Sequence, residues 1–207
     1  MFAGPGAAAV DVASDGAVGQ VGIGLSFGLI VMAMIFTFGH ISGAHINPAV
    51  SVVFFVLRRI DAARLAGYVM AQLAGAALAG VAIIAIVGIE GHAGATVPEI
   101  GGVSGAFLSE LILTFFLALV VLVVATDSRA EGSMAAIAIG GYVALAATGW
   151  GPVAGASMNP ARSFGPALAA NVWESHWVYW LAPVAGALLA VAAYQILREP
   201  AAEDETS

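Results

Sequence analysis

The sequence predicts an all-α membrane protein with six transmembrane helices, the first of them short, and two re-entrant half-helices arranged as an inverted repeat. Three observations support this fold class: an apolar composition, a series of apolar runs long enough to cross a bilayer, and one motif that occurs twice. Of the 207 residues, 61% are hydrophobic and 9% are charged, whereas a soluble domain usually has about 25% charged residues. We therefore expect the lipid bilayer to be the main partner of the chain and expect no nucleic-acid partner.

Five apolar segments have the roughly 20 residues that a membrane helix needs. The opening stretch, Met1–Val10, is apolar but about half that length, and its two glycines and one proline weaken it as an isolated helix. It is either a short helix or part of a first helix that begins upstream of this sequence. The five predicted spans cover approximately Gly19–Phe38, Leu65–Ile89, Val103–Ala125, Ser133–Gly149 and Trp177–Leu197.

Two further segments, Val50–Leu57 and Ala161–Ala170, are apolar but too short to span a bilayer. Each of them follows a polar turn that contains glycine. Non-helical backbone is tolerated at membrane depth only where it is buried in protein or lines a cavity. These segments are therefore predicted to be re-entrant half-helices.

The arginines predict the orientation of the chain, because cytoplasmic loops carry an excess of Lys and Arg. With both termini inside, five of the six basic residues face the cytoplasm, whereas loops without basic residues face outward. We therefore expect a multi-pass membrane protein with its C-terminus inside. The membrane that we expect to hold it is a bacterial inner membrane. The sixth, Arg162, lies at membrane depth, where a lone charge is costly, so it is a candidate functional residue. The five others are Arg58, Arg59, Arg64, Arg129 and Arg198.

The chain contains two copies of one unit. Ser42–Val50 (SGAHINPAV) aligns without gaps with Ala154–Arg162 (AGASMNPAR), an offset of 112 residues. Three spans separate equivalent points, and an odd number of crossings inverts the second copy; such folds place the solute site near the bilayer midplane. We expect one transmembrane domain over residues 1–198, with repeats at about 1–95 and 96–198, and an acidic, disordered tail over 199–207.

Each copy contains Asn-Pro-Ala, and the physical properties of this tripeptide predict a helix start. Asn is a preferred N-cap, and Pro is favoured at the first helical position. The carboxamide oxygen can cap its own helix, which leaves the NH2 group free to donate into a pore. Two helix N-termini that meet in the membrane would oppose the passage of cations and protons. A single Asn-Pro can be an ordinary loop-to-helix turn, but two inverted copies favour a functional site. The residues are Asn47, Pro48 and Ala49, and Asn159, Pro160 and Ala161.

The segments Gly39–Val50 (GHISGAHINPAV) and Gly155–Ala167 (GASMNPARSFGPA) resemble the paired signatures of aquaporins, also called major intrinsic proteins. The resemblance covers nearly the whole chain, and the second signature looks most like bacterial and plant nodulin-like members. It implies an aquaporin-like fold with one pore per subunit in a homotetramer. It also implies a passive channel for water and small uncharged solutes that excludes ions and protons, with no catalytic residue, cofactor or metal.

The resemblance, applied by spacing from each asparagine, assigns an outer selectivity filter to Phe27, Ala147, Ala156 and Arg162. Strict water channels of the family usually have His at the Ala147 site, and glycerol channels combine a small residue there with an aromatic at the Ala156 site. Alanine at both sites favours glycerol, urea or neutral metalloid acids. By contrast, Ser163, Ala167, Tyr179 and Trp180 look like the water-channel subgroup, so both solute classes stay open. The pore-lining carbonyls by resemblance are those of Gly43, Ala44, His45, Gly155, Ala156 and Ser157.

Glu110 is the only carboxylate well inside a predicted span. It resembles the buried structural Glu with which the family holds a re-entrant loop, and the alternative is a proton-coupling site. Family members usually have an equivalent Glu in a complete first helix, and this sequence begins too late to contain it, which predicts a fragment or a misassigned start.

Two other functions remain as alternatives. Secondary transporters also use inverted repeats and broken helices, and a closed pore would suit a non-conducting structural protein. An enzyme is not expected, because the residues offer no nucleophile with a base, no metal-ligand cluster and no phosphate loop. The chain has no cysteine, which excludes disulfides and thiolate chemistry.

Overall fold

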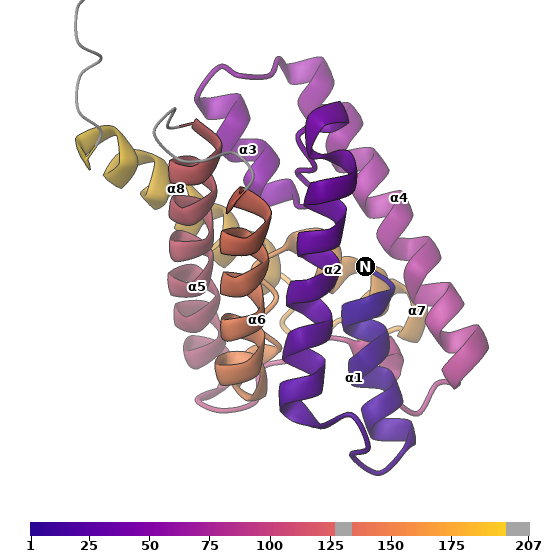
Figure 1. Cartoon of the computed structure of the whole chain (residues 1–207). Helices are drawn as coiled ribbons and strands as arrows, with labels where there is room; N and C mark the ends of the chain where they lie inside the picture. Colours follow the sequence, from indigo (N-terminus) through magenta and orange to yellow (C-terminus); the bar gives the residue numbers. More distant parts are fainter. Residues whose placement is uncertain (127–133, 198–207) are drawn as a thin grey trace, which may run out of the picture.

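The computed structural model describes residues 1–126 and 134–197. The regular elements of this part of the chain are all helical (Figure 1). The predicted acidic tail, Arg129 and Arg198 lie outside the described residues. In chain order the elements are α1 (Ala3–Ala13), α2 (Gly19–Ser42), α3 (Pro48–Val56), α4 (Ala62–Val87), the short 3-10 helix η1 (His92–Gly94), α5 (Gly102–Thr126), α6 (Ala135–Ala154), α7 (Pro160–Ala170) and α8 (Val178–Leu197).

Five of these helices, α2, α4, α5, α6 and α8, are long and apolar enough to cross a membrane. This confirms the five predicted spans, although α2 runs to Ser42, beyond the predicted end at Phe38. The first helix is short, as predicted: α1 has 11 residues and packs against α2, α4 and η1. Because of this length, the N-terminus lies at about mid-height of the bundle in Figure 1.

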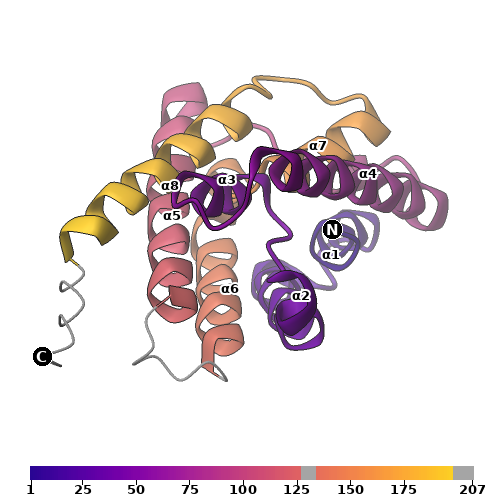
Figure 2. The ribbon, with the colours of Figure 1, turned by 90° about the horizontal axis from the view of Figure 1, so that it is seen from above.

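The two half-helices are confirmed, and each begins before its predicted start. Helix α3 has 9 residues and begins at Pro48, and α7 has 11 residues and begins at Pro160. Figure 1 shows α3 in the upper part of the bundle and α7 below it. Seen from above, α3 lies between α8 and α4, both of which it contacts (Figure 2). Helix α7 packs mainly against α4 and η1 and makes fewer contacts with α8 and α3.

The long helices pack through glycine. A Cβ atom added at Gly140 of α6 would lie 2.7 Å from the carbonyl oxygen of Gly28 on α2, and a Cβ at Gly186 of α8 would collide with the backbone of Leu111 on α5. Gly165 of α7 meets α4 in the same way. Small residues allow membrane helices to approach closely where no hydrophobic effect drives them together.

The outer faces of the bundle are apolar, as lipid contact requires. Leu78 and Ile86 on α4 are each 72% exposed, and Leu145 on α6 is 65% exposed. Such a surface would be an aggregation hazard on a soluble protein. Trp150 near the end of α6 and Trp177 just before α8 are also exposed, and exposed tryptophans near helix ends are typical of the membrane interface.

Candidate functional site

The loops that precede α3 and α7 have the same backbone conformation. Three pairs of residues, each separated by the repeat offset of 112, share a positive φ angle. A left-handed conformation costs roughly 1 kcal/mol or more for a residue other than glycine, so its presence at equivalent positions shows that the repeat extends to backbone geometry. The pairs are Gly43 and Gly155, Ala44 and Ala156, and Ile46 and Met158.

Each of these two loops ends in an asparagine that caps the half-helix after it. The side-chain oxygen of Asn47 accepts a hydrogen bond from the N–H of Ala49 at 2.9 Å, and that of Asn159 accepts from the N–H of Ala161 at 3.1 Å. Pro48 is the first residue of α3, as Pro160 is of α7. The predicted helix starts at both Asn-Pro pairs are confirmed.

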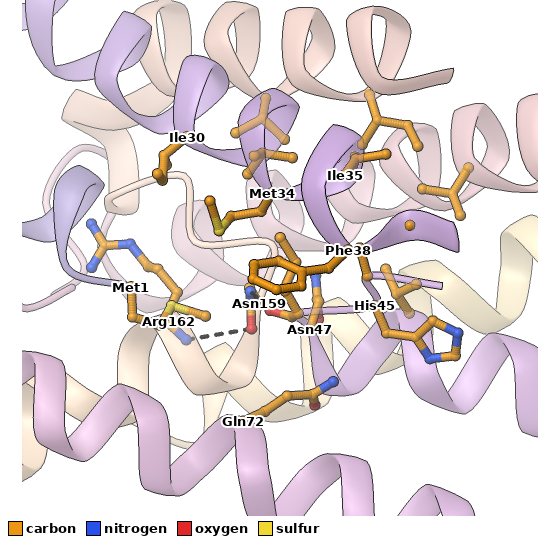
Figure 3. Close-up of a pocket in the computed structure, with 18 of the residues that line it drawn as sticks. Met1, Ile30, Met34, Ile35, Phe38, His45, Asn47, Gln72, Asn159 and Arg162 are labelled. Atoms are coloured by element: carbon orange, nitrogen blue, oxygen red, sulfur yellow. Dashed lines mark hydrogen bonds between the residues drawn. The ribbon is translucent and has the colours of Figure 1, made fainter. Parts of the chain in front are cut away.

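The two asparagines also join the half-helices tip to tip. The Asn47 Nδ2 donates to the carbonyl of Met158 at 2.7 Å, and the Asn159 Nδ2 donates to the carbonyl of Ile46 at 2.9 Å. Each acceptor directly precedes the other asparagine. The expectation that the NH2 groups are free is therefore corrected: each uses one hydrogen to hold the opposite loop and keeps its second hydrogen. Figure 3 shows the two side chains close together.

Arg162, in the first turn of α7, is fixed by contacts on two sides. Its Nη1 donates to the carbonyl of Gly94 at 2.7 Å, and its guanidinium carbon lies 4.8 Å from the centroid of the Phe27 ring on α2. Its Nε is buried and has no hydrogen-bond partner among the described residues. Gly4 of α1 leaves room for the Phe27 ring, because a Cβ at that position would collide with it. Helix α1 thus helps to position the aromatic neighbour of Arg162.

The other two predicted filter residues are close to this pair. Ala147 and Ala156 are each 3% exposed and belong to one apolar cluster with Phe27. Phe27, Ala156 and Arg162 also line the main cavity, whereas Ala147 does not. The structure therefore brings the four residues together, with Ala147 set back behind the wall.

The main cavity has a volume of about 1080 Å³. It contains Asn47, Asn159 and Arg162, and Ile30 and Met34 of α2 form part of its apolar wall (Figure 3). A mostly apolar cavity with a few polar groups suits neutral molecules that form hydrogen bonds. Five of the six predicted carbonyl residues line the cavity, namely Gly43, Ala44, His45, Ala156 and Ser157; Gly155 does not.

Glu110 is fully buried and holds the second loop. Its two carboxylate oxygens accept hydrogen bonds from the N–H of Ser157 at 2.6 Å and the N–H of Met158 at 2.7 Å. These bonds are the ones that the structural interpretation predicts, and Glu110 is not among the cavity-lining residues. The equivalent N–H groups of the first loop, those of His45 and Ile46, have no carboxylate partner in the described part of the chain.

The His45 side chain packs against aromatic and hydroxyl neighbours. Its ring stacks on Phe54 at a centroid distance of 4.5 Å, meets Tyr68 edge-on at 4.9 Å, and its Nδ1 lies 3.2 Å from the Oγ of Ser51. Over residues 1–126 and 134–197, no group of three His, Cys, Asp or Glu side chains is placed to hold a metal.

Sequence reasoning missed Gln20. Its Nε2, on α2, donates to the carbonyl of Ala147 at 2.6 Å and to that of Thr148 at 3.3 Å. Pro152, four residues after Thr148 in α6, has no N–H to offer that carbonyl, so Gln20 supplies the missing donor. A glutamine at the start of an apolar span was the available signal.

A second missed group surrounds the start of α7. The Thr96 Oγ1 donates to the Oγ of Ser163 at 2.7 Å, and the hydroxyls of Ser163 and Ser157 lie 2.6 Å apart. Thr96 follows η1, whose Gly94 binds Arg162. The segment between α4 and α5 therefore holds both Arg162 and the helix that carries it.

Comparisons with known proteins agree on one family. The sequence model of the major intrinsic protein family matches residues 1–194. Aquaporin NIP1-1 from Zea mays is 43% identical over 199 residues, which are 96% of this chain and 70% of that protein. Nodulin-26 from Glycine max is 46% identical over 178 residues, 86% of this chain and 65% of that protein. The solved structure of the aquaglyceroporin from Plasmodium falciparum is similar with a TM-score of 0.83 at 26% identity, over 95% of this chain and 90% of that one.

Proposed function

Because the chain belongs to the major intrinsic protein family and is an aquaporin-type channel for water and small neutral solutes, we propose that four residues set its selectivity: Phe27, Ala147, Ala156 and Arg162. Membership of this family confirms the prediction of a membrane channel rather than an enzyme, and it confirms the aquaporin-like fold. The chain is a multi-pass membrane protein with five long apolar helices in its described part.

The two alanines carry the proposal on solute preference. Ala156 lines the cavity, and Ala147 packs behind the wall in the same apolar cluster as Phe27, so this side of the filter is small and apolar. Arg162 offers planar donors to a hydroxyl or carbonyl oxygen on the other side. A filter with these properties admits glycerol, urea and undissociated metalloid acids as well as water.

Ion exclusion follows from the positive groups along the same path. The N-termini of α3 and α7 meet at Asn47 and Asn159 and direct their dipoles into the cavity. Arg162 adds a fixed positive charge and is 5% exposed. Cations are repelled by these groups, and a water held by the asparagine donors has no favourable orientation for proton transfer.

The remaining assignments extend this proposal. The carbonyls of the loops before α3 and α7 line the pore, and Glu110 fixes the second loop. The channel domain covers residues 1–198 as two inverted repeats, and four copies assemble through their exposed apolar faces.

Both termini lie in the cytoplasm, because Arg58, Arg59 and Arg64 gather at one end of the bundle. The plant relatives give no support to a bacterial inner membrane.

Flux measurements on purified protein in liposomes test the proposal. Stopped-flow light scattering should show fast permeation of water, glycerol and arsenous acid, and planar bilayers should show no ionic current. Ala156→Trp is the control, because an indole beside Arg162 should block the cavity; its folding is checked by hydrodynamic size. Saturable uptake that follows an ion gradient would indicate a transporter, and absence of every flux would indicate a structural protein.

A further inference from the structure

We propose that Arg58, Arg59 and Arg64, at the junction of α3 and α4, form a binding site for the phosphate headgroup of an anionic membrane lipid. These residues are three of the six Lys and Arg residues in a chain of net charge -7, and they fall within seven positions. All three line one cavity of about 620 Å³, separate from the main cavity. Its other walls include Phe55, Val56 and Asp61.

One carboxylate, that of Asp61, shares the cavity with the three guanidinium groups. Each arginine is exposed, and none of them forms an ion pair with the acidic residues that the structure describes. Asp61, the acidic residue in the cavity wall, already caps α4: its Oδ1 accepts a hydrogen bond from the N–H of Arg64 at 2.7 Å. The cavity therefore has an excess of positive charge and several unused N–H donors.

A fixed turn holds two of the arginines next to each other. The N–H of Arg58 donates to the carbonyl of Phe55 at 2.9 Å, and the N–H of Arg59 donates to the carbonyl of Phe54 at 2.8 Å. This pair of bonds is the Schellman pattern, which usually has glycine where Arg58 stands at a φ of 57°. The chain thus keeps a long cationic side chain at a position where glycine would fit without strain.

The apolar neighbours of the arginines identify the kind of ligand. Phe55 is 39% exposed and Val56 is 44% exposed at the end of α3, and both line the cavity with the arginines. A cationic group beside exposed apolar side chains matches the two parts of a phospholipid, its phosphate and its acyl chains. The guanidinium fork binds two phosphate oxygens at once. The preference for positive charge in cytoplasmic loops requires arginines in this loop but not a cavity that they share.

Lipid binding to the purified channel tests the site directly. Native mass spectrometry should count bound phosphatidylglycerol on the unmodified protein and fewer lipids when phosphatidylcholine is added instead. The triple variant R58Q/R59Q/R64Q should bind phosphatidylglycerol at least about tenfold more weakly, since each arginine near an anionic lipid contributes to binding. Its water flux should match that of the unmodified protein, because these side chains lie outside the main cavity. Equal binding of both lipids, or unchanged binding by the triple variant, would overturn the proposal.

A matched pair of variants separates a local site from a general charge effect. Asp61→Asn keeps the helix cap, because Asn caps as well as Asp, and it should tighten phosphatidylglycerol binding several-fold by removing one negative charge from the cavity. Glu174→Gln makes the same change of charge in the loop before α8 and should leave binding unchanged. Equal tightening by the two variants would overturn the assignment. Inorganic phosphate should not displace the lipid at equal concentration, and displacement would identify a site for free anions instead.

Discussion

Two alanines belong to the proposed filter: Ala156 lines the cavity, and Ala147 packs behind its wall. Replacing both Ala147 and Ala156 with valine adds four methyl groups beside Phe27 and Arg162, where the residues are already packed. We expect glycerol and arsenous acid permeability to fall at least about tenfold more than water permeability, because a few methyl groups discriminate strongly by size in a tight site. The measurement is stopped-flow permeability of the double variant for each solute.

The control for this variant is Gly141→Val on the same helix. A Cβ at Gly141 has no atom within 4 Å, so this change adds bulk outside the pore. It should leave all three permeabilities unchanged. Parallel loss of water and glycerol flux in the double variant would mean that these alanines do not bound the pore.

The Glu110 carboxylate holds the loop before α7 by accepting hydrogen bonds from two backbone N–H groups. Glutamine at this position has one acceptor oxygen and an NH2 group that would face the N–H of Ser157 or Met158. We expect Glu110→Gln to destabilise the protein by about 1–3 kcal/mol, because a buried donor loses its acceptor. Thermal unfolding in detergent measures this change.

Amide hydrogen exchange distinguishes this role from proton coupling. In the unmodified protein the amides of Ser157 and Met158 should exchange more slowly than those of His45 and Ile46, which have no carboxylate partner in the described structure. Glu110→Gln should remove the difference. If the variant abolished flux while exchange in the second loop stayed slow, Glu110 would instead act on the transported species.

At the scale of helices, close packing depends on single glycines. Gly140 and Gly141 are neighbours on α6, but Gly140 is buried against Gly28 and Met32 while Gly141 is exposed. Gly140→Ala should destabilise the protein by roughly 1–3 kcal/mol, because α2 and α6 must separate to admit the methyl group. Gly141→Ala should be neutral or stabilising by up to about 1 kcal/mol, since alanine favours the helix. Thermal unfolding of the two variants measures both changes in stability. Equal changes would contradict the close packing of Gly140 against α2.

Elements that depend on neighbouring residues can be predicted from the sequence. Contacts between residues far apart in the chain cannot. The start of α3 at Asn47 could be predicted because the cap and the proline lie within one turn. The bond of Gln20 to the Ala147 carbonyl joins residues 127 positions apart, and no local pattern requires it. The same holds for Arg162 and Gly94, which are 68 positions apart. The proposed filter residues could be assigned from the spacing in the family signatures. The contacts that position them are visible only in the structure.

At the scale of the whole molecule, the inverted repeat requires that equivalent loops lie on opposite sides of the membrane. The loop between α3 and α4 carries Arg58 and Arg59, and Arg64 follows in the first turn of α4, whereas the loop between α7 and α8 carries no arginine. In the proposed orientation the positive charge places the first loop in the cytoplasm, and three crossings between equivalent points place the second outside. The absence of cysteine allows this arrangement to be tested on an otherwise unmodified chain.

Single cysteines at Ala62 and Glu174, both exposed, should react from opposite sides. In intact cells a membrane-impermeant maleimide should label the Glu174→Cys variant, whereas the Ala62→Cys variant should require permeabilised membranes. The unmodified protein is the blank, because it has no thiol to react. Labelling of both variants in intact cells, or of Ala62→Cys alone, would contradict the proposed orientation. The first result would also contradict the inverted repeat, because loops related by an odd number of crossings cannot share one side of the bilayer.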